Sequence, residues 1–429
     1  MLVGARAVVT CRGPARARRG PEMTEIEVLP DAAVLIDGER ITWVGPRREA
    51  GGLHSAFRIP RSALDVVEVT GVLLPGFVDC HTHAVFGAPR LDDHQRRALG
   101  MDYRAIAAAG GGILESVRDL RARPEAELIE LTRGRIRTLL SHGSTTIEVK
   151  SGYGLTLETE LKQLRVVREL AASEPVSLTA TLLGAHEVPP EFRHRRAEYV
   201  RLLCDEMIPA VAQAGLAGAC DVFCEPGVFS VTEARAILTA AQRCGLGVKL
   251  HADELQGSGG AELAAELRAL SADHLTGISD AGIRALAASP TVAVLLPVTM
   301  IFLGSGRQAP ARQLLEAGAA LALASDFNPG SSPAVGLPLV MALAVSQLGL
   351  RHAEALNAVT VNGAAALGMA ADRGQIAPGF RADLVLCDVS DWREVAYWVG
   401  GNPVTAVWTG GSACRLLPGP VSLGRHVPT

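Results

Sequence analysis

The sequence has few cysteines, and their spacing does not match that of a disulfide-bonded scaffold. Eight cysteines are spread over 429 residues without a C-x-x-C pair, which excludes a disulfide-stabilised fold. Cys220 and Cys224 lie four residues apart in the apolar run ACDVFCE, and we expect both to be buried free thiols. Together with the lack of a signal-peptide pattern, this spacing predicts a protein of the reducing cytoplasm.

The sequence also lacks an excess of positive charge. Its formal net charge is −4, whereas proteins that bind nucleic acid present a clustered basic face. We therefore expect no nucleic-acid partner. The one basic cluster is RGPARARRG, residues 12–20. No apolar segment or small-residue cleavage site follows it, so we interpret it as a solvated loop rather than a targeting peptide.

Long runs of apolar residues are missing as well. Uncharged windows cover Ala285–Gly306 and Phe327–Leu350, but both contain proline and glycine. A membrane-spanning helix needs about 20 mostly apolar residues in succession, so we expect buried barrel strands with their flanking segments here and no membrane partner. With 48% hydrophobic and 20% charged residues, the composition excludes disorder and allows a large core.

The chain does contain a regular alternation of short β-rich runs with helical stretches rich in alanine and leucine. Strands that alternate with helices imply a parallel sheet, and eight such units predict a (β/α)8 barrel over residues 73–375. A doubly wound open sheet is the alternative, but no G-x-G-x-x-G follows the first strand. The eight runs are VLLPGFVDCHTH, STTIEVK, SLTATLLGAH, ACDVFCE, GVKLHADE, SADHL, VAVLLPV and ALALASDF.

The two ends of the chain carry β signals of another kind. AAVLIDGERITWVGP, residues 32–46, contains two β-rich runs around a turn at DGER, which predicts a hairpin. Near the other end, RADLVLCDV and VTAVWTGG have the same character. Residues 1–72 and 376–429 are therefore predicted to form one small β-sandwich domain beside the barrel.

Polar residues gather where the predicted strands end, which is the edge where such barrels carry their active sites. His81 and His83 project to the same face of an extended strand because one residue lies between them. With His251 and Asp326 they offer nitrogen and oxygen ligands for a divalent ion, with positions left open for water. His186 and His274 end two further strands. The other histidines are interpreted as packed or surface residues: His54, His94, His142, His194, His352 and His426.

Longer sequence motifs in the chain indicate more closely which family of proteins has this pattern of ligands. Between residues 73 and 333 the chain contains, in this order, the strings HTHAVFG, AAGGGI, EVKSGYGL, LLGAHEVPPE, CDVFCEPGVF, HADE, SADHL and SDFNPGSSP. The H-x-H pair, the histidines after strands five and six and the aspartate after strand eight resemble the amidohydrolase superfamily. The finer strings resemble its imidazolonepropionase family. This resemblance implies a barrel with a small domain built from both termini, one divalent metal ion per chain (zinc or iron), and a homodimer.

The resemblance also implies a reaction, the hydrolysis of 4-imidazolone-5-propanoate to N-formimidoyl-L-glutamate in histidine breakdown. A cyclic amide C–N bond is cleaved, and a metal that lowers the pKa of bound water suits this chemistry. Asp326 would serve as metal ligand and proton acceptor. Glu254 would be a second base, a partner of the ring nitrogen, or an orienter of a ligand. His274 would stabilise the oxyanion. Zinc, iron, manganese and cobalt all suit the ligand set.

The propanoate group of such a substrate needs a cation, and arginine binds carboxylates with two hydrogen bonds. The resemblance assigns this role to Arg90, although Ala88 and Pro89 before it depart from the family's pattern. Lys150, with Glu148, is interpreted as structural or as a support for the ligands. The AAGGGI segment is expected to be a loop near the substrate. The resemblance implies further substrate contacts from Tyr153, His186, Asn328, Gly330 and Ser331.

Two other functions compete with this interpretation. Another amidohydrolase, such as a ring deaminase or a related cyclic amidohydrolase, would share the metal ligands but would have no carboxylate to hold, so Arg90 with Tyr153 separates the two. A non-catalytic scaffold with the same fold would be expected to lack ligands, whereas this chain has all four proposed ones and His274. Hydrolysis of imidazolone propanoate is therefore the leading hypothesis.

Overall fold

The computed structural model describes residues 1–52, 65–101, 105–106 and 109–416, and two eight-stranded sheets organise them. One sheet follows the order β13-β12-β11-β10-β9-β8-β7-β6, and neighbouring strands are parallel throughout. All eight predicted barrel runs contribute one strand each. Their bounds are β6 Phe77–Asp79, β7 Ser144–Lys150, β8 Ser177–Ala185, β9 Ala219–Cys224, β10 Gly247–Ala252, β11 Ser271–His274, β12 Val292–Leu295 and β13 Ala320–Leu323.

The barrel closes between the segments that follow its first and last strands. Thr82 and Phe327 form an isolated parallel bridge, the His83 amide donates to Phe327 O at 2.8 Å, and the Asp326 amide donates to His81 O at 3.0 Å. The closing seam therefore brings two predicted metal-binding histidines next to the predicted aspartate ligand. The open-sheet alternative is excluded, because the segments that follow β6 and β13 meet at this seam.

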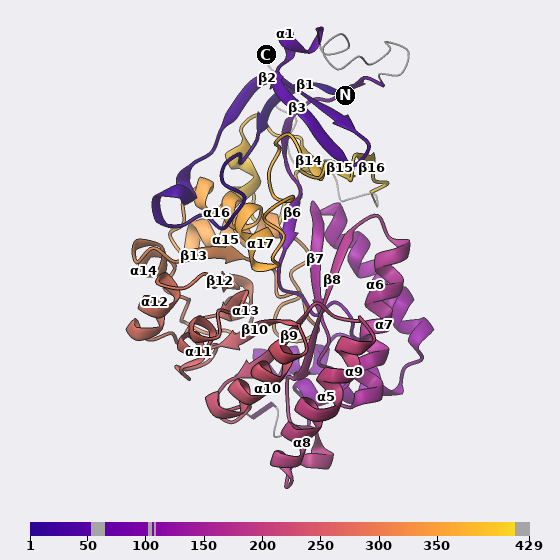
Figure 1. Cartoon of the computed structure of the whole chain (residues 1–429), viewed down its shortest axis with the longest axis vertical. Helices are drawn as coiled ribbons and strands as arrows, with labels where there is room; N and C mark the ends of the chain where they lie inside the picture. The colour runs from indigo at the N-terminus through magenta and orange to yellow at the C-terminus, as the bar shows by residue number, and fades with distance from the viewer. Residues whose placement is uncertain (53–64, 102–104, 107–108, 417–429) are drawn as a thin grey trace.

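Helices surround the barrel sheet (Figure 1). In α10, the buried residues recur with a helical period on the side that faces the sheet, and Ser230 caps its first turn with Glu233. The longer helices are α3 Leu91–Ala98, α5 Ile113–Ala122, α6 Glu125–Ser141, α7 Leu157–Ser173, α10 Val231–Arg243, α12 Asp280–Ala287 and α15 Leu337–Gln347. The shorter helical segments are α1 Arg47–Ala50, η1 Gly20–Thr24, η3 Pro190–Phe192, α8 Arg196–Leu202, η4 Leu203–Met207, α9 Ile208–Gln213, α11 Gly260–Glu266, α13 Pro297–Phe302, α14 Ala311–Glu316, α16 His352–Ala358, α17 Val361–Ala366 and η5 Trp392–Ala396.

The second sheet joins the two ends of the chain, as predicted. Its order is β16-β15-β14-β5-β1-β2-β3, with β4 paired to β1, and Figure 1 shows indigo strands beside yellow ones at one end of the molecule. Parts of the two predicted ranges, residues 53–64 and 417–429, lie outside the described residues. The strands are β1 Leu2–Val9, β2 Val28–Asp37, β3 Arg40–Pro46, β4 Val67–Glu68, β5 Val72–Pro75, β14 Leu384–Cys387, β15 Val404–Thr409 and β16 Ser412–Ala413.

The run VLLPGFVDCHTH is divided between the two sheets, whereas the sequence suggested a single strand. Val72–Pro75 pairs with β1 and β14 in the terminal sheet, and only Phe77–Asp79 belongs to the barrel. Gly76 lies between them, and its amide donates to Asp383 O. A Cβ atom at Gly76 would lie 2.2 Å from Thr145 Oγ1, so glycine permits the close approach that lets the chain pass from one sheet to the other.

The basic segment at residues 12–20 is not simply a solvated loop, and that interpretation was wrong for two of its arginines. Arg18 is fully buried, where it donates to Cys11 O, Glu25 O and Asn357 Oδ1. Arg19 donates to Ala287 O and Ser289 O on the barrel. Carbonyl oxygens accept hydrogen bonds from both guanidinium groups, so the segment fastens the N-terminal part of the chain to the barrel.

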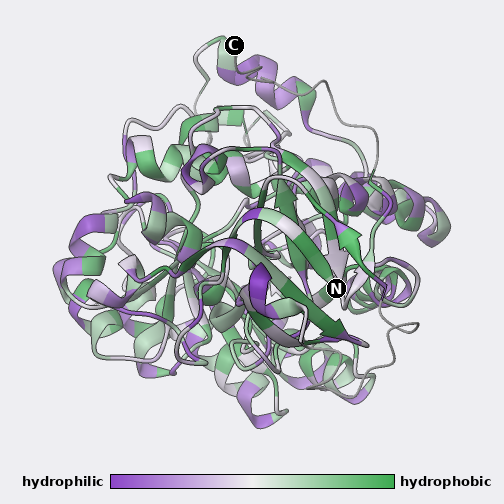
Figure 2. Ribbon diagram, turned by 90° about the horizontal axis from the view of Figure 1, so that it is seen from above, coloured by the Kyte–Doolittle hydropathy of each residue, from purple (hydrophilic) through white to green (hydrophobic). Residues whose placement is uncertain are grey.

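The first uncharged window and the cysteine pair behave as the sequence predicted, whereas the second window forms a helix rather than a barrel strand. The first window contains β12 and α13, and the second contains α15. None of the helices within the described ranges is both long enough and apolar enough to cross a membrane. Cys220 and Cys224 are buried free thiols. Seen from above in Figure 2, hydrophobic residues concentrate along the strands, and hydrophilic residues lie on the outer helices.

Candidate active site

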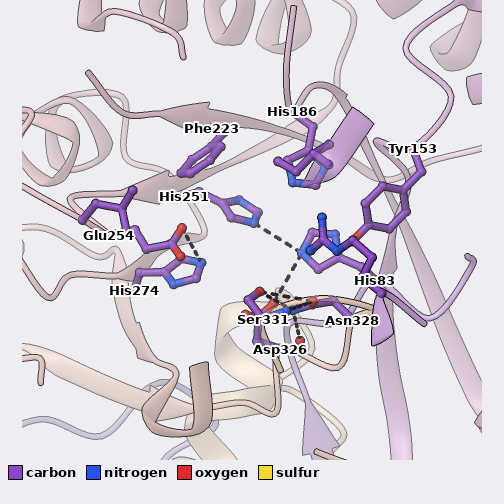
Figure 3. Close-up of a pocket in the computed structure, with 13 residues that line it drawn as sticks. His83, Tyr153, His186, Phe223, His251, Glu254, His274, Asp326, Asn328 and Ser331 are labelled. Carbon is purple, nitrogen blue, oxygen red and sulfur yellow. Dashed lines mark hydrogen bonds and ion pairs between the residues drawn. The ribbon is translucent and has the colours of Figure 1, made fainter. Parts of the chain in front are cut away.

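Three imidazoles and one carboxylate converge at the carboxyl edge of the barrel, and Figure 3 shows His83, His251 and Asp326 of this set. His83 Nε2 lies 3.3 Å from His81 Nε2 and 3.4 Å from His251 Nε2. Asp326 Oδ1 lies 3.5 Å from both His81 Nε2 and His83 Nε2. All four side chains are buried. The four predicted ligands therefore lie together, and two overlapping groups could hold a metal ion: His81 with His83 and Asp326, and His81 with His251 and His274.

Two further carboxylates orient the histidines of this cluster. His81 Nδ1 lies 2.5 Å from Asp273 Oδ2, and His251 Nδ1 lies 3.0 Å from Asp221 Oδ2. A carboxylate beside Nδ1 favours the tautomer that carries its proton there, so the lone pair of Nε2 faces the centre of the cluster. Histidines that bind metals are held in this way in other proteins.

The charge state of the cluster also fits a cation. Burial lowers the pKa of His81 and His83 well below the usual value, so both imidazoles are neutral and able to bind a metal. Burial raises the pKa of Asp326 to about 6, and Thr299 Oγ1 donates to its Oδ2 at 2.7 Å. A cation beside Asp326 would favour its ionised form.

A layer of buried charges lies below the cluster inside the barrel. Lys150 Nζ is 2.7 Å from Asp221 Oδ2 and 3.0 Å from Glu148 Oε2, while Lys249 Nζ is 2.7 Å from Glu148 Oε2. With Asp273 and Asp326 included, four carboxylates face two ammonium groups, a formal charge of −2. A divalent cation would balance this charge, which is a second reason to infer that the site fits such an ion.

Glu254 and His274 lie on one side of the cluster as a pair. His274 Nε2 is 3.6 Å from Glu254 Oε2, and both side chains line the pocket. Burial, with the charges of Asp326 and Glu225, raises the pKa of Glu254 well above its usual value. Burial lowers the pKa of His274, and neither of its ring nitrogens has a hydrogen-bond partner among the described residues. The pair therefore offers a protonated carboxyl group and a neutral imidazole.

Arg90 reaches the pocket from the segment after β6. Its amide donates to Pro329 O at 2.9 Å, and its side chain crosses the backbone of Gly330, where a Cβ atom would lie 1.5 Å from Nη2. The guanidinium group is buried, with Asp93 Oδ2 3.8 Å from Nε. Nε and Nη1 have no hydrogen-bond partner among the described residues, so this cation is ready to bind an anion.

The loop after β13 is held together by one side chain. Asn328 Oδ1 accepts the amides of Gly330 and Ser331 at 2.8 and 2.7 Å, and its Nδ2 donates to Asp326 O and Ser331 Oγ. Asn328 and Ser331 line the pocket, whereas Gly330 lies outside its lining and makes room for Arg90. The side chain of Asn328 is therefore largely engaged in shaping the loop that carries Asp326.

Tyr153 and His186 form the wall opposite Glu254. Their ring centroids are 5.4 Å apart, and the His186 ring stacks on His83 at 5.3 Å. His186 Nδ1 lies 3.0 Å from Gly152 O, so Nδ1 donates there and Nε2 is left as an acceptor. Glu160 fixes the loop by accepting the amides of Gly152, Gly154 and Leu155.

These groups line one pocket at the carboxyl edge of the barrel. Of the twelve site residues predicted from the sequence, only His81 and Gly330 are absent from its lining, and both contact residues that line it. Ala108 of the AAGGGI segment lies outside the described residues, but Ile113 lines the pocket as expected of a loop near the substrate. The lining residues are His83, Arg90, Ile113, Tyr153, His186, Phe223, His251, Glu254, Leu255, His274, Asp326, Asn328 and Ser331.

Sequence reasoning missed the residues that support the site from behind. Asp221 lies in a run interpreted only as apolar, and Glu160 lies within a helix. Glu225 accepts the amides of residues 254–256 and so fixes the backbone of Glu254. A signal for Asp221 was present, because a charged residue inside an otherwise apolar strand needs a buried partner. Glu160 and Glu225 carry no such signal.

Strained backbone marks the same edge of the barrel. Asp253, His274, Leu275 and Asp326 all have positive φ, at 53°, 79°, 63° and 53°, a region that residues other than glycine rarely adopt. Asp253 follows β10, His274 and Leu275 lie at the end of β11, and Asp326 follows β13. Such strain gathers at functional sites, where the surrounding structure holds it in place.

Comparison with known proteins agrees with this architecture. Residues 72–414 match the amidohydrolase family. The fold resembles guanine deaminase of E. coli, with a TM-score of 0.71 and 16% identity over 97% of this chain and 99% of that one. It also resembles an adenosine deaminase of Xanthomonas campestris with bound zinc, with a TM-score of 0.68 and 20% identity over 97% and 93% of the two chains. At this identity the likeness shows the shared fold alone.

Barrel, terminal sheet and family match together define the class of the protein, a hydrolase of the amidohydrolase type. Much closer relatives exist. The chain is 47% identical over 409 residues to imidazolonepropionase of Symbiobacterium thermophilum, covering 95% of each protein. It is 48% identical over 396 residues to imidazolonepropionase of Deinococcus radiodurans, covering 92% of this chain and 95% of that protein. The chain belongs to the imidazolonepropionase family.

Proposed function

We propose that this enzyme hydrolyses the cyclic amide C–N bond of 4-imidazolone-5-propanoate and releases N-formimidoyl-L-glutamate, a step of histidine breakdown. The observation that carries this proposal is the Arg90 guanidinium group, which is buried in the pocket with Nε and Nη1 free of hydrogen-bond partners among the described residues. A buried cation without such partners is costly unless a ligand supplies them. The propanoate carboxylate is such a ligand, and the relatives' name agrees with it.

One divalent ion, zinc or iron, would be held by His81, His83, His251 and Asp326. The convergence of three Nε2 atoms and one carboxylate oxygen supports this assignment. When bound, such an ion polarises a carbonyl oxygen and brings the pKa of water toward neutrality. Metal analysis of the purified protein tests both the identity of the ion and the ratio of one per chain.

The remaining polar groups divide the proton transfers between them. Asp326, ionised beside the cation, accepts a proton from the attacking water. Glu254 carries a proton because burial raises its pKa, and it donates that proton to the ring nitrogen as the C–N bond breaks. His274 is neutral and donates a hydrogen bond to the oxygen that becomes negatively charged. Cleavage leaves a carboxylic acid and a formimidoyl nitrogen that carries the proton from Glu254. The acid becomes a carboxylate by returning a proton to Glu254, and Asp326 releases the proton taken from water to solvent.

The substrate would span the pocket from the metal cluster to Arg90. Arg90 binds the propanoate, while Tyr153 and His186 line the side of the ring. His186 lines the pocket and stacks on His83, and its Nδ1 is engaged by Gly152 O, so Nε2 is the ring nitrogen left for the substrate. Asn328, Gly330 and Ser331 form the loop below Arg90, and Ser331 is close enough to the pocket to contact the substrate.

A ring deaminase is the second candidate, and the deaminases of the same fold favour it only distantly. Such an enzyme acting on a neutral base has no carboxylate to satisfy Arg90. A scaffold without activity is disfavoured by the two groups of histidine and aspartate side chains that could hold a metal ion. We further propose a homodimer in the cytoplasm, on the strength of the family alone, and light scattering of the purified protein tests the dimer.

Arg90→Ala is the decisive variant. Loss of a charged hydrogen-bond pair to the propanoate is expected to lower kcat/KM for imidazolone propanoate by about 10²-fold or more, with the metal content unchanged. Arg243→Ala, an exposed arginine at the end of α10, is the matched control and should keep full activity. If Arg90→Ala turned over the substrate at the normal rate, the carboxylate clamp would be wrong.

A further inference from the structure

A buried lysine lies directly behind the proposed metal centre, at the end of β7. The side chain of Lys150 is 0% exposed, and its Nζ contacts three carboxylates, at 2.7 Å from Asp221 Oδ2, 3.0 Å from Glu148 Oε2 and 3.6 Å from Asp273 Oδ2. These partners come from β7, β9 and β11. The ammonium group thus joins three strands across the inside of the barrel.

Two of these carboxylates are the ones that orient histidines of the metal cluster. Asp221 Oδ2 lies between Lys150 Nζ and His251 Nδ1, at 2.7 and 3.0 Å. Asp273 Oδ2 lies between Lys150 Nζ and His81 Nδ1, at 3.6 and 2.5 Å. Through one carboxylate oxygen on each side, a single ammonium group is connected to two of the three histidines.

We propose that Lys150 is a positioning residue that sets the metal affinity of the site by holding Asp221 and Asp273 as acceptors for His251 and His81. The inference rests on the proposed metal centre. Without the ammonium group, each buried carboxylate would lose the contact that fixes its position beside the histidine. A carboxylate that can shift no longer holds the imidazole ring in the orientation that directs the Nε2 lone pair toward the metal.

The same contacts exclude a different role for this lysine. A carboxylated lysine, which could itself bridge two metal ions, carries a negative charge. At this position that charge would face three carboxylates within 3.6 Å, an arrangement that repulsion forbids. Burial alone would lower the pKa of Lys150, but the charges of Asp221, Glu148 and Asp273 raise it above the usual value, so the amine stays protonated and unreactive.

Lys249 provides a matched comparison inside the same barrel. Its side chain is 1% exposed, and its Nζ contacts Glu148 Oε2 at 2.7 Å and Cys80 O at 2.9 Å. It forms no ion pair with Asp221 or Asp273, although burial raises the pKa of Asp273 and the charge of Lys249 opposes that rise. Removing Lys249 therefore removes one buried positive charge, whereas removing Lys150 also removes the direct contacts to the two orienting carboxylates.

The experiment compares Lys150→Met and Lys249→Met in the full chain, with zinc affinity measured by competition against a chromophoric chelator. Lys150→Met is expected to bind zinc about 10- to 100-fold more weakly than the wild type, as expected for loss of the groups behind a metal ligand. Lys249→Met is expected to lose much less, about 5-fold at most on the same scale. Lys150→Arg, which keeps the cation, should recover part of the affinity lost in Lys150→Met.

Unchanged zinc affinity in Lys150→Met would overturn the proposal, and so would equal losses in the two methionine variants, because equal losses would report general damage to the barrel. If Lys150→Met does not fold, Asp221→Asn and Asp273→Asn serve in its place, because each breaks one of the two connections. Each variant should bind zinc more weakly than the wild type. Wild-type zinc affinity in both variants would again overturn the proposal. A wild-type protein that binds no divalent ion would instead refute the proposed metal centre.

Discussion

The two sheets of this molecule fill their interiors in opposite ways. In the barrel, charged residues point inward and contact one another across the strands: Glu148, Lys150, Asp221, Lys249 and Asp273. In the terminal sheet, the interior is a cluster of aliphatic side chains with Trp408, among them Leu2, Val34, Leu73 and Leu384. Burial of apolar surface stabilises a fold directly, whereas buried ion pairs roughly offset their own desolvation cost.

This contrast indicates that the barrel interior serves the chemistry of the site, whereas the terminal sheet serves the stability of the fold. The barrel interior is arranged to present imidazoles to a cation, and its hydrophobic packing is moved outward, where Ile147 and Val149 of β7 face the surrounding core. The terminal sheet has no polar cluster of this kind within the described residues. We therefore expect substitutions in the barrel rim to change function more than stability, and substitutions in the terminal sheet to do the reverse.

The largest expected effect is the loss of function in His251→Ala. Removal of one proposed metal ligand should lower kcat/KM by on the order of 10³-fold or more and leave less than one equivalent of metal on the purified protein. The far-ultraviolet circular dichroism should be unchanged, because Asp221 keeps its contact with Lys150. His352→Ala on α16 is the control and should retain both metal and activity. Full activity in His251→Ala would refute the ligand assignment.

The opposite result is expected from Leu384→Ala in β14. Leu384 is fully buried in the terminal cluster, and deletion of such a side chain costs about 2–5 kcal/mol through lost burial and a cavity. Denaturant unfolding should show this loss, while KM and metal content remain at wild-type values below the unfolding transition. A large change in KM with little change in stability would show that the terminal sheet also shapes the active site.

The pH dependence of stability should distinguish the two regions as well. Burial, with the charge of His251, lowers the pKa of His186 from 6.5 to about 3. Below about pH 6.5, His186 therefore binds a proton in the unfolded chain but stays neutral in the folded protein. The free energy of unfolding falls as the pH is lowered from 6.5 toward 3, by up to about 1.4 kcal/mol per pH unit.

His186→Asn removes this titration. In metal-free protein, the free energy of unfolding should then fall by about 1 kcal/mol less between pH 7 and pH 5.5 than in the wild type. Leu384→Ala should keep the wild-type slope, because none of the residues that form the terminal cluster is ionisable. An identical slope in His186→Asn would show that His186 is accessible to protons in the folded state.

Much of this organisation could be predicted from the sequence, and the failures have physical causes. The eight strand runs and the ends that hold His81, His83, His251 and Asp326 were visible because strand positions alternate and carboxyl ends meet at one edge. The division of the first run at Gly76 was not, because Val72–Pro75 and Phe77–Asp79 are equally apolar and only tertiary pairing separates them.

Partners that are distant along the chain account for the other failures. The basic segment gave no sign that Arg18 would find carbonyl acceptors in its own loop and an amide oxygen more than 300 residues away. The role of Lys150 depends on Asp221 and Asp273, which only barrel closure brings within reach. Local patterns predict which face a side chain takes, but they do not identify the group that it meets there.

Two glycines with positive φ provide the smallest and most direct comparison of the regions. Gly38 turns the β2–β3 hairpin at φ +54°, with nothing within 4 Å of a built Cβ atom. Gly38→Ala should therefore cost only the backbone strain, about 1 kcal/mol, with unchanged kinetics. Gly152, at φ +106°, would place its Cβ atom 2.8 Å from His186 Nδ1 and 2.9 Å from Leu183 O.

Gly152→Ala should thus cause backbone strain similar to that in Gly38→Ala, and it should also displace the side chain of His186. The expected result is a rise in KM of about 10-fold, since the cost of moving a side chain that positions the substrate is of the order of 1.4 kcal/mol, and the loss of stability should be close to that of Gly38→Ala. Steady-state kinetics and denaturant unfolding of both variants measure the difference. If Gly152→Ala lost stability but kept its KM, His186 would belong to the packing of the barrel rather than to the binding of substrate.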